Sequence, residues 1–112
     1  MTEHDICVSL CEYIAYKYPD VWNVTFHIPN EGKRHKNARV LHAGLKAGVP
    51  DYFIAMPRGD FAGMFLEIKT TKGKLSNNQK AWIKRFKDQG YCTAVGWGLE
   101  DAINKVERYL GL

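Results

Sequence analysis

The chain has 112 residues, a hydrophobic share of 46% and a formal net charge of +4. This length suits one domain, residues 1–112, with a single core, and the composition is that of an ordinary soluble protein. No apolar run reaches the length of a membrane span and the start, MTEHD, does not resemble a signal peptide, so we expect a cytoplasmic protein without a membrane partner.

The first half of the chain predicts a helix, a strand and a second helix. Apolar residues at helical spacing predict a helix from Glu3 to about Lys17, with Glu3 inside its apolar stripe. Pro19 ends this helix, and the β-branched and aromatic residues 21–28 (VWNVTFHI) predict a strand. A polar, basic loop follows, after which residues 38–46 predict a short helix closed by Gly48.

The second half predicts three strands and two helices. Residues 52–56 and 64–70 predict strands that form a hairpin, with Asp51 at the entrance of the first. Ser76 and Gln79 have the spacing of a capping box that opens a helix ending near Gln89. Residues 91–98 predict another strand and residues 99–110 an amphipathic helix. The order αβαββαβα predicts an α/β fold with a mixed central sheet flanked by helices.

The three cysteines indicate a reducing compartment rather than a disulfide framework. We interpret Cys7, Cys11 and Cys92 as buried small apolar residues. A zinc site using His4, Cys7 and Cys11 is an alternative, but the sequence offers no second ligand pair at a recognised spacing.

Positive charge is concentrated in the middle of the chain. Residues 33–87 carry 13 of the 16 Lys and Arg residues and only three acidic ones. Such a distribution is typical of a surface that meets phosphates, although a solvated lysine face looks the same in sequence. We expect phosphate contacts from the densest cluster and from the loop after the 64–70 strand: Lys33, Arg34, Lys36, Arg39, Lys72 and Lys74.

Charged side chains interrupt the 64–70 strand in a pattern that is compatible with a metal-dependent catalytic site. Glu67 and Lys69 share one face of the strand, and Asp51 opens the neighbouring one. Two carboxylates and a backbone carbonyl, such as that of Ile68, can hold Mg²⁺, which phosphodiester hydrolysis needs at neutral pH. Lys69 can act on the attacking water or on the negative charge of the transition state. Glu3 is a further candidate ligand or water-holder. A Glu-x-Lys triplet alone is weak evidence for a catalytic site, because it arises by chance in roughly a third of chains of this length.

The wider pattern resembles the VRR-NUC family within the PD-(D/E)xK nuclease superfamily, in particular its stand-alone phage and bacterial members. Glu3 and Ile6 match the opening helix, HIPNEGKR the basic loop, and LKAGVPD, FLEIKTTKGKLSNNQKAW and QGY the core motifs. The resemblance implies a restriction-endonuclease-like fold and catalytic positions at Asp51, Glu67 and Lys69. It also implies accessory active-site positions at Glu3 and Gln79. Cys7 departs from the family, which often has glutamine there.

The resemblance further implies a Mg²⁺- or Mn²⁺-dependent DNA endonuclease that needs no organic cofactor. Stand-alone members resemble homodimers that act on branched DNA, such as four-way junctions or flaps; a phage-encoded member would work in the host cytoplasm. An inactive DNA-binding module on the same fold and a protein-interaction domain remain alternatives. For several residues a structural role is an alternative to a functional one. Gln79 can serve only as a helix-capping residue. Surface exposure or core packing, rather than contact with DNA, can explain His27, His35, His42, Trp22, Trp82 and Trp97.

Overall fold

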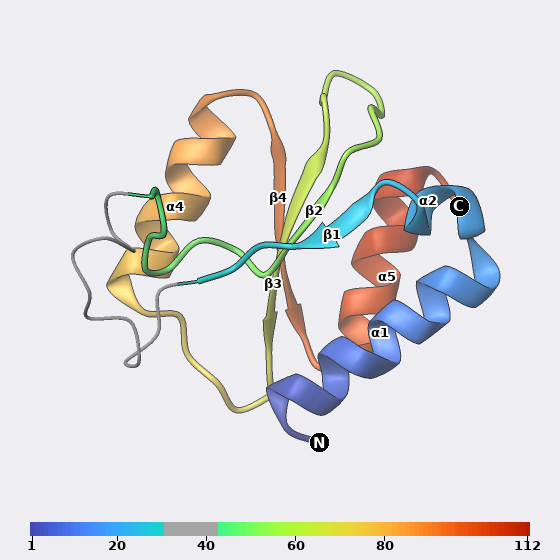
Figure 1. Cartoon of the computed structure of the whole chain (residues 1–112), viewed down its shortest axis with the longest axis horizontal. Helices are drawn as coiled ribbons and strands as arrows, with labels where there is room; N and C mark the ends of the chain where they lie inside the picture. Colours follow the sequence, from blue (N-terminus) through green and yellow to red (C-terminus); the bar gives the residue numbers. More distant parts are fainter. Residues whose placement is uncertain (31–42) are drawn as a thin grey trace.

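The computed structural model describes residues 1–30 and 43–112 as a mixed α/β fold (Figure 1). The first helix and the last begin and end where the sequence predicts. The elements in chain order are α1 (Glu3–Lys17), α2 (Pro19–Trp22), β1 (Thr25–His27), β2 (Tyr52–Ile54), β3 (Met64–Lys69), α4 (Asn77–Asp88), β4 (Cys92–Trp97) and α5 (Leu99–Leu110).

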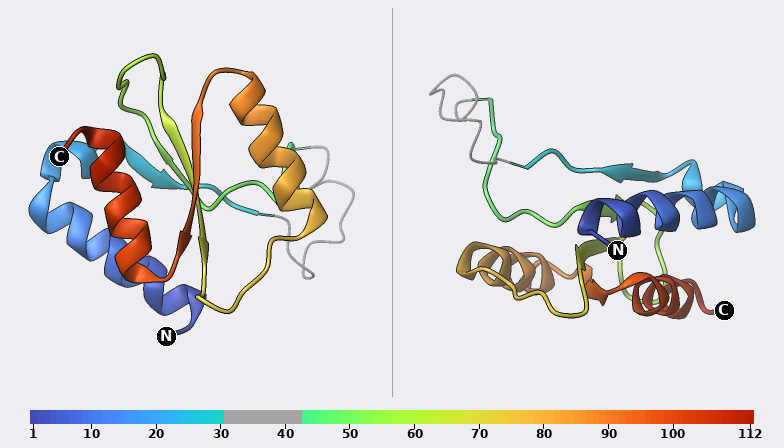
Figure 2. Two further views of the ribbon diagram at one scale, coloured as in Figure 1. Left: turned by 180° about the vertical axis from the view of Figure 1, so that it is seen from behind. Right: turned by 90° about the horizontal axis from the view of Figure 1, so that it is seen from below.

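The described strands form one sheet in the order β1-β2-β3-β4. The pairs β1–β2 and β2–β3 are antiparallel, which confirms the predicted hairpin, whereas β3–β4 is parallel. α4 covers one face of this mixed sheet and α1 and α5 cover the other, as Figures 1 and 2 show from three sides. The helix α4 itself forms the crossover between the two parallel strands.

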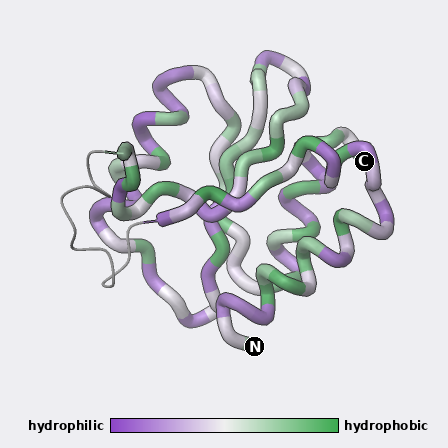
Figure 3. The backbone as a smooth tube through the Cα atoms, viewed as in Figure 1, coloured by the Kyte–Doolittle hydropathy of each residue, from purple (hydrophilic) through white to green (hydrophobic). Residues whose placement is uncertain are grey.

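The core lies between the sheet and the α1–α5 layer. Alternate positions of β3 are buried on this side, because successive strand residues point to opposite faces. Figure 3 shows the hydrophobic positions along the strands and their recurrence along α1 and α5. The core residues are Ile6, Leu10, Ile14, Val21, Tyr52, Ile54, Met64, Leu66, Ile68, Ala102, Val106 and Leu110.

A polar cluster joins α1 to α5 beside this core. The carboxylate of Glu107 accepts hydrogen bonds from the hydroxyls of Tyr13 and Tyr18, at 2.8 and 2.5 Å, and from the Lys17 ammonium at 3.2 Å. These bonds, led by the one from Tyr18, hold the pKa of Glu107 below its usual value. The two helices are therefore fixed to each other by charge-assisted hydrogen bonds as well as by apolar packing.

Two predicted elements need correction. The strand expected over residues 21–28 is shorter, because Pro19 starts the four-residue helix α2 and only residues 25–27 form β1. Proline is favoured at the first helical position, where its missing N–H has no intrahelical partner to lose. Of the helix expected over residues 38–46, residues 43 and 44 form a turn and residues 45 and 46 have no regular structure; residues 38–42 lie outside the described residues.

In the described part of the chain, none of the helices combines the length and apolar character needed to cross a membrane.

Candidate active site

Asp51 and Glu67 face each other across the β2–β3 hairpin. Tyr52 pairs with Leu66 in the antiparallel register, so Asp51, one residue earlier, lies opposite Glu67. Both carboxyls lie on the α4 side of the sheet, because Tyr52 and Leu66 point into the core on the other side. The hairpin thus brings together two acidic residues that are 16 positions apart in the chain.

The Glu67 side chain is buried, with a relative exposure of 2%. Burial, a hydrogen bond with Asp51 and the negative charge of Asp51 together raise its pKa to about 9. A hydrogen bond between two carboxyls requires a proton between them. Glu67 Oε1 itself has no hydrogen-bond partner in the part of the chain that the structure describes. Two carboxylates in this position therefore need a cation.

The backbone of Ile68 turns toward the same point. Its N–H donates a hydrogen bond of 2.7 Å to Asp51 Oδ2. In a strand the N–H and C=O of one residue point to the same edge, so the Ile68 carbonyl is directed to the β2 side as well. The neighbouring Lys69 carbonyl points the other way and accepts from the Gly98 N–H. Asp51 Oδ1, Glu67 and the Ile68 carbonyl are consequently oxygen atoms available at one end of the hairpin.

Lys69 extends from β3 on the same face as Glu67, and its side chain is 11% exposed. Its ammonium lies 4.0 Å from the carboxylate of Glu3, which is 49% exposed in the first turn of α1. Glu3 therefore pairs with Lys69 and does not join the carboxyls of Asp51 and Glu67. Among residues 1–30 and 43–112, no three His, Cys, Asp or Glu side chains come close enough to form a metal-binding cluster, and this includes the zinc alternative.

The cysteines of α1 pack against the core, on the side of the sheet opposite the carboxyls. Burial, together with the neighbouring thiols of Cys7 and Cys11, raises the pKa of the Tyr52 hydroxyl. Burial raises the pKa of Cys7 to about 11, so its thiol stays protonated at neutral pH. Cys7 and Cys11 act as partly buried residues at the rim of the core, in line with the simpler interpretation of the sequence.

Three contacts hold the segment that leads into Asp51. The Asn30 side chain donates to the Val49 carbonyl at 2.7 Å and accepts from the Gly48 N–H at 3.0 Å. The Trp82 indole donates to the Ala47 carbonyl at 3.0 Å. Asn30 is not among the site residues expected from the sequence, although its place directly after a Pro at a strand end is a signal for such a turn-stabilising amide.

Gly48 also packs against the beginning of α4. Its φ is +86°, and a Cβ atom there would lie 2.6 Å from the Cβ of Asn78 and 2.9 Å from the backbone nitrogen of Gln79. Only glycine fits both the backbone conformation and the space. The start of α4 thereby packs directly on the segment that positions Asp51.

Gln79 occupies the third position of α4 and completes the predicted capping box. Its side-chain oxygen accepts from the Ser76 N–H at 2.8 Å, while its own N–H donates to the Ser76 hydroxyl at 3.1 Å. The capping interpretation is thus confirmed. The side-chain NH₂ of Gln79 is not used by the box, so an additional active-site role stays a prediction.

The expected DNA-contacting residues fall into two groups. Lys72 and Lys74 are exposed on the segment between β3 and α4, directly after Lys69. The cluster Lys33, Arg34, Lys36 and Arg39 lies outside the described residues, as do His35 and His42. His27 is exposed and packs edge-to-face on Tyr52, and Trp82 stacks on Phe86.

Comparison with known proteins identifies the group to which this fold and site belong. The model of the VRR-NUC domain family matches residues 10–96. The chain belongs to the VRR-NUC domain family. The matched VRR-NUC region contains Asp51, Glu67, Lys69 and Gln79 but begins after Glu3. Family membership makes this a nuclease-type domain of DNA processing.

A solved structure, described as a VRR_NUC domain protein, has the same fold. It superposes with a TM-score of 0.88 at 24% sequence identity, over 99% of this chain and 89% of the other. The search of curated proteins found none that matches. The structural likeness confirms the mixed sheet with flanking helices as the VRR-NUC fold.

Proposed function

We propose that this VRR-NUC domain is a divalent-metal-dependent endodeoxyribonuclease that hydrolyses phosphodiester bonds. The supporting observation is the buried Glu67 carboxyl, which faces Asp51 and has an oxygen without a partner in the described part of the chain. Two adjacent anions would repel a phosphate, and a DNA-binding surface has no use for them unless a cation lies between.

The available donors suit Mg²⁺ or Mn²⁺. Both are hard cations that prefer carboxylate and carbonyl oxygens and retain several waters, so two or three protein ligands are enough. Asp51, Glu67 and the Ile68 carbonyl would hold the ion. When bound, it would neutralise charge on the phosphate and lower the pKa of a water.

Lys69 would act beside this ion on the attacking water or on the reacting phosphate. Its ammonium is largely buried, which strengthens its interaction with the negative charge that develops on the phosphate oxygens. Glu3, at 4.0 Å, would keep the ammonium aimed toward the site and hold a water there. The side-chain NH₂ of Gln79 would contribute a donor from the beginning of α4.

Lys72 and Lys74 follow the catalytic strand and would contact the phosphates of the strand being cut. Lys33, Arg34, Lys36 and Arg39 would extend this contact along the DNA. We further propose that the substrate is branched DNA and that the protein acts as a homodimer, because a two-fold symmetric junction offers one scissile strand to each subunit. Light scattering of the purified protein at micromolar concentration tests the dimer.

The decisive experiment measures cleavage of labelled junction, flap, single-stranded and linear duplex DNA with Mg²⁺, Mn²⁺ or EDTA. Asp51→Asn and Lys69→Ala should each lower the cleavage rate by at least about 100-fold, because each removes a group that acts on the transition state. Both should still bind DNA. Asp60→Asn and Lys84→Ala, which alter exposed residues away from the site, are the matched controls.

Two outcomes would contradict the proposal. Cleavage at the parental rate by Asp51→Asn and Lys69→Ala would remove these residues from catalysis. Salt-sensitive DNA binding without cleavage by the parent under any metal condition would instead establish an inactive DNA-binding module on the VRR-NUC fold.

A further inference from the structure

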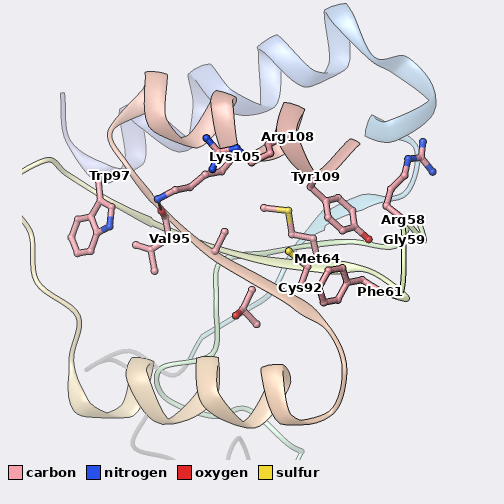
Figure 4. A pocket seen from close by; sticks show the side chains of 12 residues that line it. Arg58, Gly59, Phe61, Met64, Cys92, Val95, Trp97, Lys105, Arg108 and Tyr109 are labelled. Carbon is pink, nitrogen blue, oxygen red and sulfur yellow. Dashed lines mark hydrogen bonds between the residues drawn. The ribbon is translucent and has the colours of Figure 1, made fainter. Parts of the chain in front are cut away.

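A second site lies along the outer edge of β4, the edge that faces away from β3 and the carboxylates. A groove of about 680 Å³ runs between this strand, α5 and the β2–β3 connection (Figure 4). β4 is the last strand of the sheet, so its outer edge has no strand beside it in the described structure. The strand sequence, CTAVGW, contains no charged residue or proline to discourage pairing with another chain.

The direction of the main chain decides which groups face this edge. The N–H groups of Cys92 and Gly98 both donate to carbonyls on the β3 side, at 3.0 and 2.8 Å. Alternate residues of a strand direct their main-chain groups to opposite edges. Thr93, Val95 and Trp97 therefore present their N–H and C=O groups to the outer edge.

α5 covers only one end of this edge. Lys105 donates to the Val95 carbonyl at 2.6 Å, and Asp101 accepts from the Trp97 N–H at 2.9 Å. The two side chains also form an ion pair of 2.9 Å with each other. The edge is thus closed near Trp97, whereas the N–H and C=O of Thr93 and the N–H of Val95 lie beside the open groove.

The open end of the edge adjoins an apolar hollow with a basic rim. Phe61, Met64, Cys92 and Tyr109 line it, and Figure 4 shows the Tyr109 ring beside Met64 and Cys92. The Tyr109 hydroxyl is fixed by donation to the Met56 carbonyl at 2.7 Å. The lining residues include the cations Arg58, Lys105 and Arg108 and no acidic side chain. Because Lys105 is paired with Asp101, Arg58 and Arg108 are the two cations that can face a ligand.

We propose that this groove binds an extended acidic segment of a partner protein, which pairs with β4 at Thr93 and places one apolar side chain in the hollow. Main-chain pairing would supply affinity and the hollow with its rim would supply selectivity, as in other cases of strand addition to a sheet edge. The groove takes a partner while the carboxylate site, on the other side of β3, stays open to DNA.

The groove could also be occupied by a second copy of this chain or by single-stranded DNA, but both fit it less well than an acidic peptide. A second copy of this chain, paired edge to edge, would bring Arg58 and Arg108 of both copies to one interface, and such like-charge contacts oppose association. Single-stranded DNA matches the cations and aromatic rings but cannot offer the alternating N–H and C=O groups that complement Thr93. An acidic peptide strand satisfies both features.

The test compares Thr93→Pro with Thr93→Ala in the full chain. Proline deletes the outward N–H and obstructs pairing at an edge, where it does not break the sheet, whereas alanine keeps the N–H. The probe is a fluorescein-labelled octapeptide of alternating Glu and Val with one central Phe, measured by fluorescence anisotropy. We expect binding that weakens with salt, an at least tenfold weaker affinity for Thr93→Pro, and less than threefold change for Thr93→Ala.

Charge reversal provides a second variant that keeps the strand intact. Arg108→Glu, at an exposed position on α5, should weaken binding of the acidic peptide at least tenfold and favour the counterpart peptide with Lys in place of Glu. If Thr93→Pro does not fold, this variant carries the test. DNA cleavage should be unchanged in all three variants.

Three results would overturn the inference. The first is that the parent does not bind the acidic peptide. The second is that Thr93→Pro and Arg108→Glu bind it as tightly as the parent does. The third is that single-stranded DNA displaces the peptide. Self-association that Arg108→Glu strengthens would assign the groove to a second copy instead. None of these readouts requires the chain to cut DNA, so a failure of the proposed nuclease activity would be recognised separately.

Discussion

The buried pair of carboxyls connects stability to function at a single residue. Glu67 has little access to water, and its pKa of about 9 lies above the ordinary value of 4.5 because of burial and the neighbouring Asp51. Between these two pH values the folded protein retains a proton that the unfolded chain has released. The free energy of unfolding of the metal-free protein therefore decreases as the pH rises through this window.

This linkage predicts that Glu67→Gln stabilises the metal-free protein at alkaline pH. The amide has nearly the shape of the protonated carboxyl and cannot ionise, so the melting temperature in EDTA should exceed that of the parent by several degrees at pH 8 and converge with it near pH 5. The variant should also lose the stabilisation that Mn²⁺ gives the parent. Glu12→Gln, on the exposed side of α1, is the control, and parallel melting profiles of parent and Glu67→Gln would contradict the prediction.

At the scale of elements, the beginning of α4 combines folding and function. The capping box between Ser76 and Gln79 satisfies N–H groups of the first turn, and the same turn packs on Gly48 next to the segment that holds Asp51. A stability role and an active-site role for Gln79 can be separated only by comparing both members of the box.

We predict that Ser76→Ala and Gln79→Ala destabilise the fold similarly, by about 1 kcal/mol each, because each removes one half of the capping box. Only Gln79→Ala should also reduce DNA cleavage, by roughly tenfold, since one hydrogen bond contributes on this order. Urea unfolding and cleavage rates below the melting transition distinguish the effects. Equal cleavage by the two variants would leave Gln79 as a capping residue alone.

Local signals explain which elements were predictable from the sequence. The periodicity of α1 and α5 and the turn before β3 are encoded by neighbouring residues, and the hairpin register then places Asp51 opposite Glu67. The short helix α2 was missed because β-branched and aromatic residues outweighed the proline that starts it. The contacts of Asn30, Trp82 and Gly48 with the segment before Asp51 depend on tertiary packing between distant elements, which no local pattern reveals.

At the scale of the whole molecule, positive charge is concentrated in the part of the chain that holds the candidate active site. Residues 33–87 carry a net charge of +10 and the remainder carries −6. Lys69, Lys72 and Lys74 follow one another from the candidate active site along the segment toward α4, so the basic part of the chain includes the site where a phosphate would be cut. Association with DNA should accordingly depend on salt through the cations of this region.

The last prediction concerns the cluster in the basic loop. Replacing Lys33, Arg34 and Lys36 together by Gln should weaken DNA binding and reduce the slope of log K against log salt by up to about 3, because each phosphate contact releases close to one counterion. Cleavage at saturating DNA should be preserved, since the carboxylate site is unchanged. The matched control replaces Lys80, Lys84 and Lys87, three lysines of α4, by Gln and removes the same total charge. An unchanged slope in the loop variant would exclude these three residues from the DNA interface, and equal slopes in both variants would indicate a diffuse effect of net charge rather than contact by the loop.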